Sequence, residues 1–167
     1  MNLKSIDIKH CVHIMPDSHL SFSFIRELES YERNKSTYFI LVKSDLKKEV
    51  SLSLYKNAHY LKDTKVNYSS LIDVLKPESN LILHSFYLHQ YKFILEAKKK
   101  KATIYWLFWG FEGYKAIHWN YNLNQFFNRT KQSPLNIKEI ILNFYFALND
   151  RLVTKKIIDL IDYCCTW

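Results

Sequence analysis

The sequence predicts an α/β fold with a mostly parallel β-sheet and helices on both of its faces. Short apolar runs rich in β-forming residues alternate along the chain with segments whose apolar residues recur at helical spacing. The length of 167 residues suits a single domain that can bury its own core. Only two glycines are present, which excludes the glycine-rich loops that cradle phosphates in nucleotide-binding proteins.

The first third of the chain has the pattern of a strand, a helix and a second strand. Apolar residues at even positions predict a strand over 7–14. Helical spacing of apolar residues follows over 20–28, where either Asp17 or Ser18 can act as the N-cap. The run at 37–42 is short, largely apolar and rich in β-forming residues, which is typical of a buried strand.

The rest of the chain continues this alternation. Its predicted elements are a short strand at 50–54, a helix at 69–75, a buried strand at 81–86, a helix at 88–99, a strand at 102–108 and a long helix that begins near Pro134. Residues 157–167 fit either a helix end followed by a strand or a single strand. The order indicates a Rossmann-like sheet over residues 1–167.

In a parallel α/β sheet, ligands bind at the carboxyl ends of the strands. This rule points to four loops, which lie around Asp17, at 43–48, after His84 and at 109–114. Asp17 suits a general base or an acceptor of hydroxyl hydrogen bonds, with His19 beside it, although an N-cap is the structural alternative. His84 is either a buried core histidine or a hydrogen-bonding partner of a sugar or diphosphate.

The composition bears on the partners of the protein. Its net charge is +8, from 20 lysines and only 4 arginines among its basic residues. Lysine is a hydrated point charge, so the excess indicates attraction to an anionic surface more than readout of nucleic acid. Coding bias is an alternative source of the lysines. We expect no nucleic-acid partner and no membrane span, because no apolar stretch reaches about 20 residues.

The cysteines and histidines indicate neither a disulfide framework nor a metal site. Three cysteines, two of them adjacent, are typical of a reduced, cytoplasmic compartment. The charged N-terminus does not have the pattern of a signal peptide. His10 and His13 are three positions apart on one predicted strand and would point to opposite faces. His84 and His89 do not have zinc-ligand spacing. We therefore expect no metal and no other cofactor.

Both glycines lie in one window that follows the strand at 102–108. Within it, Trp109, Glu112 and Tyr114 bring aromatic side chains and a carboxylate to one loop, a combination that suits carbohydrate binding. Gly110 allows a sharp exit from the strand. The window therefore predicts a sugar-binding loop at the carboxyl edge of the sheet.

Three stretches resemble one family. They are the segment from His13 to Asp17 followed by Phe24 and Ile25, the strand that ends at His84, and above all Trp106 to Tyr114. Together they are similar to the N-terminal domain of the glycosyltransferases that transfer 4-acetamido-4,6-dideoxygalactose (N-acetylfucosamine) from its TDP-sugar to a lipid-linked acceptor. That bacterial family has the GT-B arrangement and a Trp-Gly-x-Asp-x-Tyr motif. Here Glu112 replaces the aspartate of the motif.

The resemblance implies a transferase, peripheral on the cytoplasmic face of the bacterial plasma membrane, that acts on a polyprenyl-diphosphate-linked saccharide. Asp17 would be the base, and the residues that bind the substrate would be His19, His84, Trp109, Gly110, Glu112 and Tyr114. The length matches an acceptor-side half, so we expect the C-terminal donor-binding domain to be absent or on a separate chain. The alternatives are a single-stranded nucleic-acid-binding module and a non-catalytic interaction protein with a degenerate transferase fold.

Overall fold

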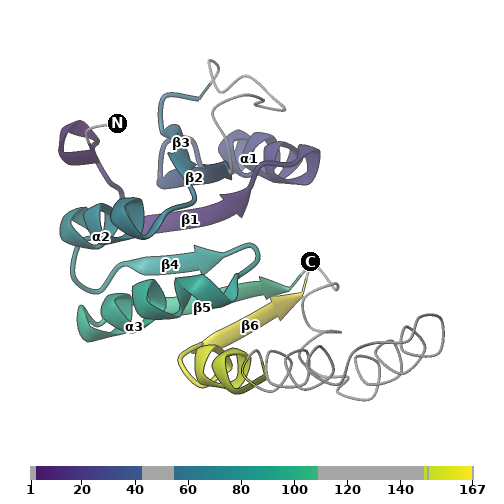
Figure 1. Cartoon of the computed structure of the whole chain (residues 1–167). Helices are drawn as coiled ribbons and strands as arrows, with labels where there is room; N and C mark the ends of the chain where they lie inside the picture. Colours follow the sequence, from purple (N-terminus) through teal and green to yellow (C-terminus); the bar gives the residue numbers. More distant parts are fainter. Residues whose placement is uncertain (1–2, 43–54, 109–148, 150, 167) are drawn as a thin grey trace, which may run out of the picture.

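A computed structural model describes residues 3–42, 55–108, 149 and 151–166. Six parallel strands form one sheet in the order β3-β2-β1-β4-β5-β6 (Figure 1). The strands are β1 (Cys11–Pro16), β2 (Ser36–Val42), β3 (Ala58–Lys62), β4 (Asn80–Leu83), β5 (Thr103–Phe108) and β6 (Tyr163–Thr166). The predicted α/β class with a parallel, Rossmann-like sheet is confirmed.

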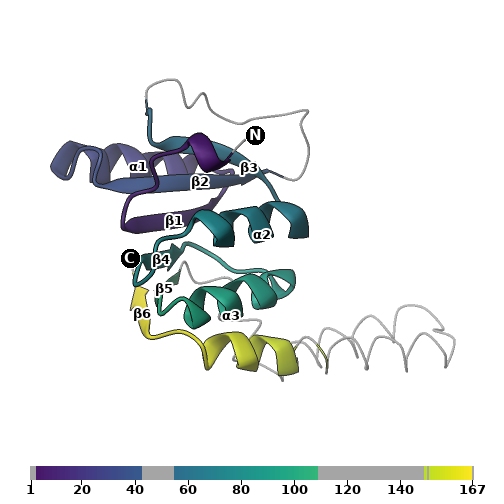
Figure 2. The ribbon, with the colours of Figure 1, turned by 90° about the vertical axis from the view of Figure 1, so that its left-hand side faces the viewer.

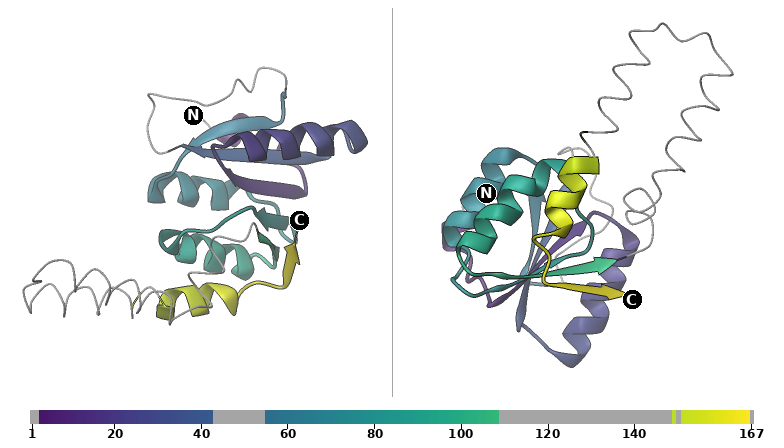
Figure 3. Two further views of the ribbon diagram at one scale, coloured as in Figure 1. Left: turned by 90° about the vertical axis from the view of Figure 1, so that its right-hand side faces the viewer. Right: turned by 90° about the horizontal axis from the view of Figure 1, so that it is seen from below.

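Helices cover both faces of the sheet, as predicted. Helix α1 (His19–Tyr31) lies on one face, while α2 (Lys65–Val74), α3 (Tyr91–Lys99) and the helical residues 151–158 lie on the other (Figures 2 and 3). Short 3₁₀ helices occupy Leu3–Ser5 and Leu88–Gln90. Alternation along the strands divides the core accordingly. In β1, Ile14 belongs to the large cluster on the α2 and α3 side, and Met15 packs with Ile25 of α1.

The start of each helix has a local cause in the sequence. Ser18 is the N-cap of α1, because its side chain accepts a hydrogen bond from the Ser21 amide at 3.2 Å. The capping role that the sequence left open between two residues therefore goes to Ser18 and not to Asp17. Thr64 caps α2 in the same way, so this helix begins four residues earlier than predicted.

Several predicted boundaries were wrong. The first strand begins at Cys11 instead of residue 7, so His10 precedes it, and it continues through Pro16. Pro16 lies opposite Leu41 of β2, beyond the last residue of β1 that pairs with β4. Strand β4 ends at Leu83, three residues early, and β3 was not predicted at all. Residues 157–167 follow the first of their two alternatives, a helix end and then β6. The strand predicted at 50–54 and the start of the helix near Pro134 lie outside the described residues.

Among the residues that the structure describes, three other than glycine have a positive φ: Asn34 (58°), Glu78 (61°) and Lys101 (61°). Lys101 follows the last turn of α3 in a Schellman motif. Its own amide donates to Lys98 O at 2.8 Å, and the Ala102 amide donates to Ala97 O at 3.0 Å. This position ordinarily favours glycine, which the composition almost lacks.

Candidate functional site

Strands β2 and β3 are added on one side of β1, and β4, β5 and β6 are added on its other side. The switch point of the sheet therefore lies between β1 and β4. The carboxyl ends of two such strands frame the crevice in which parallel α/β sheets bind ligands. Asp17 is the first residue after β1, and His84 is the first residue after β4. The His84 amide donates to Ile14 O at 2.9 Å, which ties the end of β4 to β1. Two predicted site residues from distant segments therefore lie at the carboxyl ends of the strands that flank the switch point. Figure 1 shows these two strands, β1 and β4, side by side.

The side chain of His84 pairs with that of His13, a contact that the sequence did not predict. Nδ1 of His13 and Nε2 of His84 are 2.9 Å apart, and both side chains are buried. The Phe24 ring of α1 packs edge-on against His84 with the ring centroids 4.4 Å apart. Tyr38 lies opposite His13 in the neighbouring strand, with centroids 4.9 Å apart. We call these four residues the imidazole cluster.

Burial makes both imidazoles neutral at physiological pH. It lowers the pKa of His13 to about 3. Burial, and then the neighbouring His13, hold the pKa of His84 well below its usual range. A neutral imidazole has one N–H donor and one bare nitrogen that accepts. The pair is therefore hydrogen-bonded without charge, with one ring donating to the other.

The other predicted site residues fall into two groups. Asp17 is half-buried, and His19 is exposed at the first position of α1. Strand β5 ends at Phe108 at the same edge of the sheet, next to β4. The motif residues beyond it, which are Trp109, Gly110, Glu112 and Tyr114, lie outside the described residues, as does the loop at 43–48.

The sequence reasoning missed two sets of residues. His13 was considered only as a metal ligand, although it is a polar residue in a strand beside the strand of His84. The second set joins the loop after β3 to the segment after β4, because Asp63 accepts hydrogen bonds from Tyr68 Oη and His89 Nε2, both at 2.6 Å. Gln90 then donates to Tyr68 Oη at 2.7 Å. Asp63 directly follows β3, and because β3 was not predicted, the sequence offered no reason to place Asp63 at the carboxyl edge of the sheet.

The lysine run at the end of α3 is largely engaged within the molecule. Lys98 pairs with Asp162 at 2.7 Å, and Lys99 pairs with Glu96 at 2.6 Å. The Lys100 ammonium donates to the Ile72 and Leu75 carbonyls at the end of α2, at 2.5 and 3.2 Å. Lys100 therefore ties the end of α3 to the end of α2, and Lys98 ties α3 to the turn before β6, whereas the Lys99 pair stays within α3.

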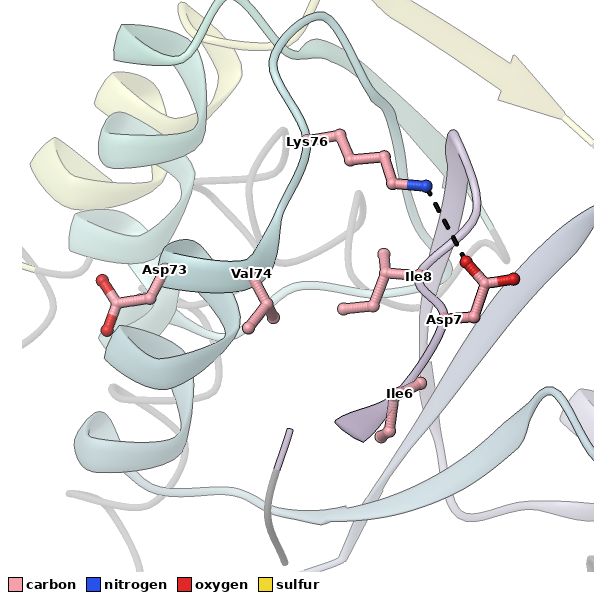
Figure 4. A pocket seen from close by; sticks show the side chains of 6 residues that line it. All are labelled: Ile6, Asp7, Ile8, Asp73, Val74 and Lys76. Atoms are coloured by element: carbon pink, nitrogen blue, oxygen red, sulfur yellow. Dashed lines mark ion pairs between the residues drawn. The ribbon is translucent and has the colours of Figure 1, made fainter. Parts of the chain in front are cut away.

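A pocket of about 400 Å³ lies at the opposite end of the sheet from Asp17 and His84. It is lined by residues that precede β1 or β4, which are Ile6, Asp7, Ile8, Asp73, Val74 and Lys76 (Figure 4). Nζ of Lys76 lies 3.9 Å from Oδ1 of Asp7 (Figure 4). None of the predicted site residues lines this pocket, so we assign no function to it.

Within the described ranges, no three histidine, cysteine or acidic side chains are grouped so that they could hold a metal ion. No helix in that part of the chain is long and apolar enough to cross a membrane. The three cysteines are free thiols. Comparisons with protein-family models, with curated proteins and with solved structures found no match.

Proposed function

We propose that this protein is the acceptor side of a glycosyltransferase. It would transfer a deoxyamino sugar, such as 4-acetamido-4,6-dideoxygalactose, from a TDP-sugar to a polyprenyl-diphosphate-linked glycan at the cytoplasmic face of the membrane. The observation that carries the proposal is the position of Asp17 and His84. Both belong to stretches that resemble the transferase family, and both lie at the carboxyl ends of the strands that flank the switch point.

The chemistry assigned to Asp17 is general base catalysis. A hydroxyl oxygen of the acceptor sugar attacks the anomeric carbon of the donor, and the bond from that carbon to the TDP oxygen breaks. TDP leaves with the bonding electrons, and the hydroxyl proton passes to the Asp17 carboxylate. Its position supports this role, because Asp17 directly follows β1 at the carboxyl edge of the sheet.

Acceptor binding is the first test, because it asks only for the half of the reaction that this protein supplies. The probe is a water-soluble, short-chain polyprenyl diphosphate that carries a disaccharide, titrated into the full chain by calorimetry. We expect saturable binding that Asp17→Ala weakens about tenfold, or about 1.4 kcal/mol. The matched control is Asp73→Ala, an exposed aspartate on α2 that should leave affinity unchanged. Absence of binding would contradict the proposal.

Transfer is the second test. The chain is mixed with the acceptor probe, the TDP-sugar and a donor-binding domain of the resembled family, and the extended product is measured by mass spectrometry. Loss of a general base typically costs about 10²–10⁴ in rate. We expect Asp17→Asn to lose activity by that factor and Asp73→Asn to keep it. A fully active Asp17→Asn variant would remove the catalytic role.

A further inference from the structure

A second group of polar side chains lies at the carboxyl edge of the sheet. Asp63 directly follows β3, and Tyr68 lies on α2. His89 and Gln90 belong to the 3₁₀ helix between β4 and α3. Two strands, β2 and β1, separate β3 from β4 in the sheet, so the group joins segments that are not neighbours in the strand order. We call these four residues the carboxylate–imidazole group.

The direction of each hydrogen bond in the group follows from a backbone amide. The Tyr87 amide can only donate, and it donates to Gln90 Oε1 at 2.9 Å. The Gln90 Nε2 amino group therefore faces Tyr68 and donates to its hydroxyl oxygen at 2.7 Å. The single hydroxyl hydrogen of Tyr68 is donated to Asp63 Oδ1 at 2.6 Å. Burial, and then this hydrogen bond, raise the pKa of Tyr68, so the hydroxyl keeps its hydrogen.

Asp63 in turn sets the orientation of the His89 ring. Oδ1 of Asp63 lies 2.6 Å from Nε2 of His89. An ionised carboxylate only accepts hydrogen bonds, so Nε2 carries the hydrogen and a neutral ring is bare on Nδ1. The Tyr87 ring stacks on the imidazole, with the ring centroids 5.6 Å apart and 8° between the planes. Both the plane of the imidazole and its direction within that plane are therefore held.

The two partners differ in exposure. The side chain of Asp63 is 8% exposed, whereas that of His89 is 42% exposed. Because Nε2 faces the buried carboxylate, the exposed part of the imidazole lies elsewhere on the ring. A histidine held by a carboxylate on one nitrogen, with the other nitrogen open to a reactant, is the arrangement that activates histidine in acid–base and nucleophilic catalysis.

The charge of the surrounding sequence favours an anionic reactant. Segments 60–72 and 84–95, which hold the group, contain three lysines and one acidic residue, Asp63. The lysines occupy exposed positions, which are Lys62, Lys65 and Lys92. Asp63 is directed at the imidazole, so the outer charges are positive. A phosphoryl group carries negative charge and therefore suits these segments better than a neutral acyl group does.

We propose that His89 is a phosphoryl-accepting site, in which Nδ1 attacks the phosphorus of a small phosphoryl donor such as a phosphoramidate. The bond between Nδ1 and phosphorus forms as the bond from phosphorus to the leaving group breaks, and the leaving group departs with that electron pair. The proton on Nε2 passes to Asp63, which leaves the phosphorylated imidazole ring neutral. Tyr68 is a positioning residue, because it acts on His89 only through Asp63. The proposal goes beyond the proposed glycosyl transfer and does not rest on it.

The test incubates the full chain with potassium phosphoramidate. Phosphorus NMR distinguishes a phosphoryl group on Nδ1 from one on Nε2, and mass spectrometry of peptides identifies the modified histidine. We expect Nδ1 of His89 to react about tenfold faster than the exposed His10, the factor given by one hydrogen bond to a charged group. Reaction on Nε2 of His89, or equal rates at His10 and His89, would overturn the proposal. No sugar or lipid is present, so the result is independent of the proposed function.

Variants then test the role of the carboxylate. Asp63→Asn removes the group that receives the Nε2 proton, so phosphorylation of His89 should slow about tenfold and Nε2 should react as well. Asp73→Asn, an exposed position on α2, is the matched control and should change neither the rate nor the nitrogen that reacts. Tyr68→Phe keeps the carboxylate but removes its hydrogen bond, so its rate should lie between those of wild type and Asp63→Asn. An unchanged rate and unchanged selectivity for Nδ1 in Asp63→Asn, shown to be folded by its amide spectrum, would overturn the role of Asp63.

Discussion

His13 and His84 are 71 positions apart in the sequence, yet their rings are joined by a 2.9 Å hydrogen bond between two central strands. Both side chains are buried on a sheet face whose other members are mostly apolar. Burial of a polar ring without a partner would cost about 1–3 kcal/mol. Pairing the two rings offsets that cost and explains how two neutral histidines persist beneath α1.

The first prediction concerns stability against pH. Burial lowers the pKa of His13 to about 3, while an unfolded histidine titrates near 6.5. Below pH 6.5 the unfolded chain therefore binds a proton that the folded protein does not. The free energy of unfolding is therefore unaffected by the titration of His13 above pH 6.5. As the pH falls from 6.5 toward the folded pKa, this free energy decreases by up to about 1.4 kcal/mol per pH unit. Urea unfolding between pH 7.5 and 4.5 measures this loss.

The matched variants for this prediction are His13→Gln and His19→Gln. The first removes the buried titration, so the free energy of unfolding should depend less steeply on pH. The second removes an exposed histidine at the start of α1 and should leave the slope unchanged. Equal slopes in wild type and His13→Gln would show that His13 does not titrate as the structure implies.

Lys101→Gly should stabilise the protein. Lys101 occupies the left-handed position of the Schellman motif after α3, with φ at 61°. A side chain there costs about 1–2 kcal/mol relative to glycine, partly offset by the greater freedom of glycine in the unfolded chain. We expect a net gain of about 0.5–1 kcal/mol in chemical denaturation. Glu96→Gly, at an exposed position within α3, should instead lose about 1 kcal/mol, and a gain there would contradict the conformational explanation.

Asp162 should hold the start of β6 against β5. Its carboxylate accepts the Ile104 amide at 2.7 Å and pairs with Lys98, while its own amide donates to Ile104 O at 2.9 Å. Burial raises the pKa of Asp162, but the Ile104 and Lys98 hydrogen bonds outweigh this and lower it overall. Asp162→Ala should cost about 1–3 kcal/mol because the Ile104 amide loses its acceptor. The measure is amide exchange in β5.

The control for Asp162 is Asp159→Ala, an exposed aspartate in the same segment. It should change stability by less than about 0.5 kcal/mol. Asp162→Asn keeps an acceptor oxygen, so its loss of stability should lie between those of Asp162→Ala and Asp159→Ala. If all three behave alike, Asp162 does not organise the β5–β6 pair.

Vesicle flotation tests the proposed contact with an anionic membrane. The net charge of +8 should favour vesicles that contain phosphatidylglycerol over neutral ones, at about 1 kcal/mol for each lysine near the surface. Because Lys98 and Lys99 have partners within the molecule, Lys155→Gln with Lys156→Gln, two exposed positions, should reduce flotation more than Lys98→Gln with Lys99→Gln, which removes the same charge. Equal binding to neutral and anionic vesicles would remove the electrostatic contribution.

Periodicity in the sequence was enough to predict the strands and helices that have strong apolar patterns, such as β2, α1 and β5. It failed at β3, whose residues His59, Tyr60 and Lys62 do not form a strict apolar alternation at the edge of the sheet. It also misplaced the start of β1, because Ile6 and Ile8 continue an alternating pattern before the strand begins. Ile8 is buried in the core without being part of the strand.

The candidate site could be predicted in part. Asp17 and His84 followed from the rule that ligands bind at strand carboxyl ends, and the sheet order now places both at its switch point. The pairing of His84 with His13 could not be predicted, because it depends on β1 and β4 being neighbours. Neither strand's own sequence specifies that neighbour.

The most direct test of the account is to map acceptor binding onto the chain. The full protein is labelled with ¹⁵N and titrated with the short-chain polyprenyl-diphosphate-linked disaccharide, and amide shift changes are followed by NMR. The account predicts the largest changes at residues 14–19 and 83–86, at the carboxyl ends of β1 and β4. Changes confined to the pocket around Asp7 and Lys76 at the amino end, or no changes at all, would contradict it.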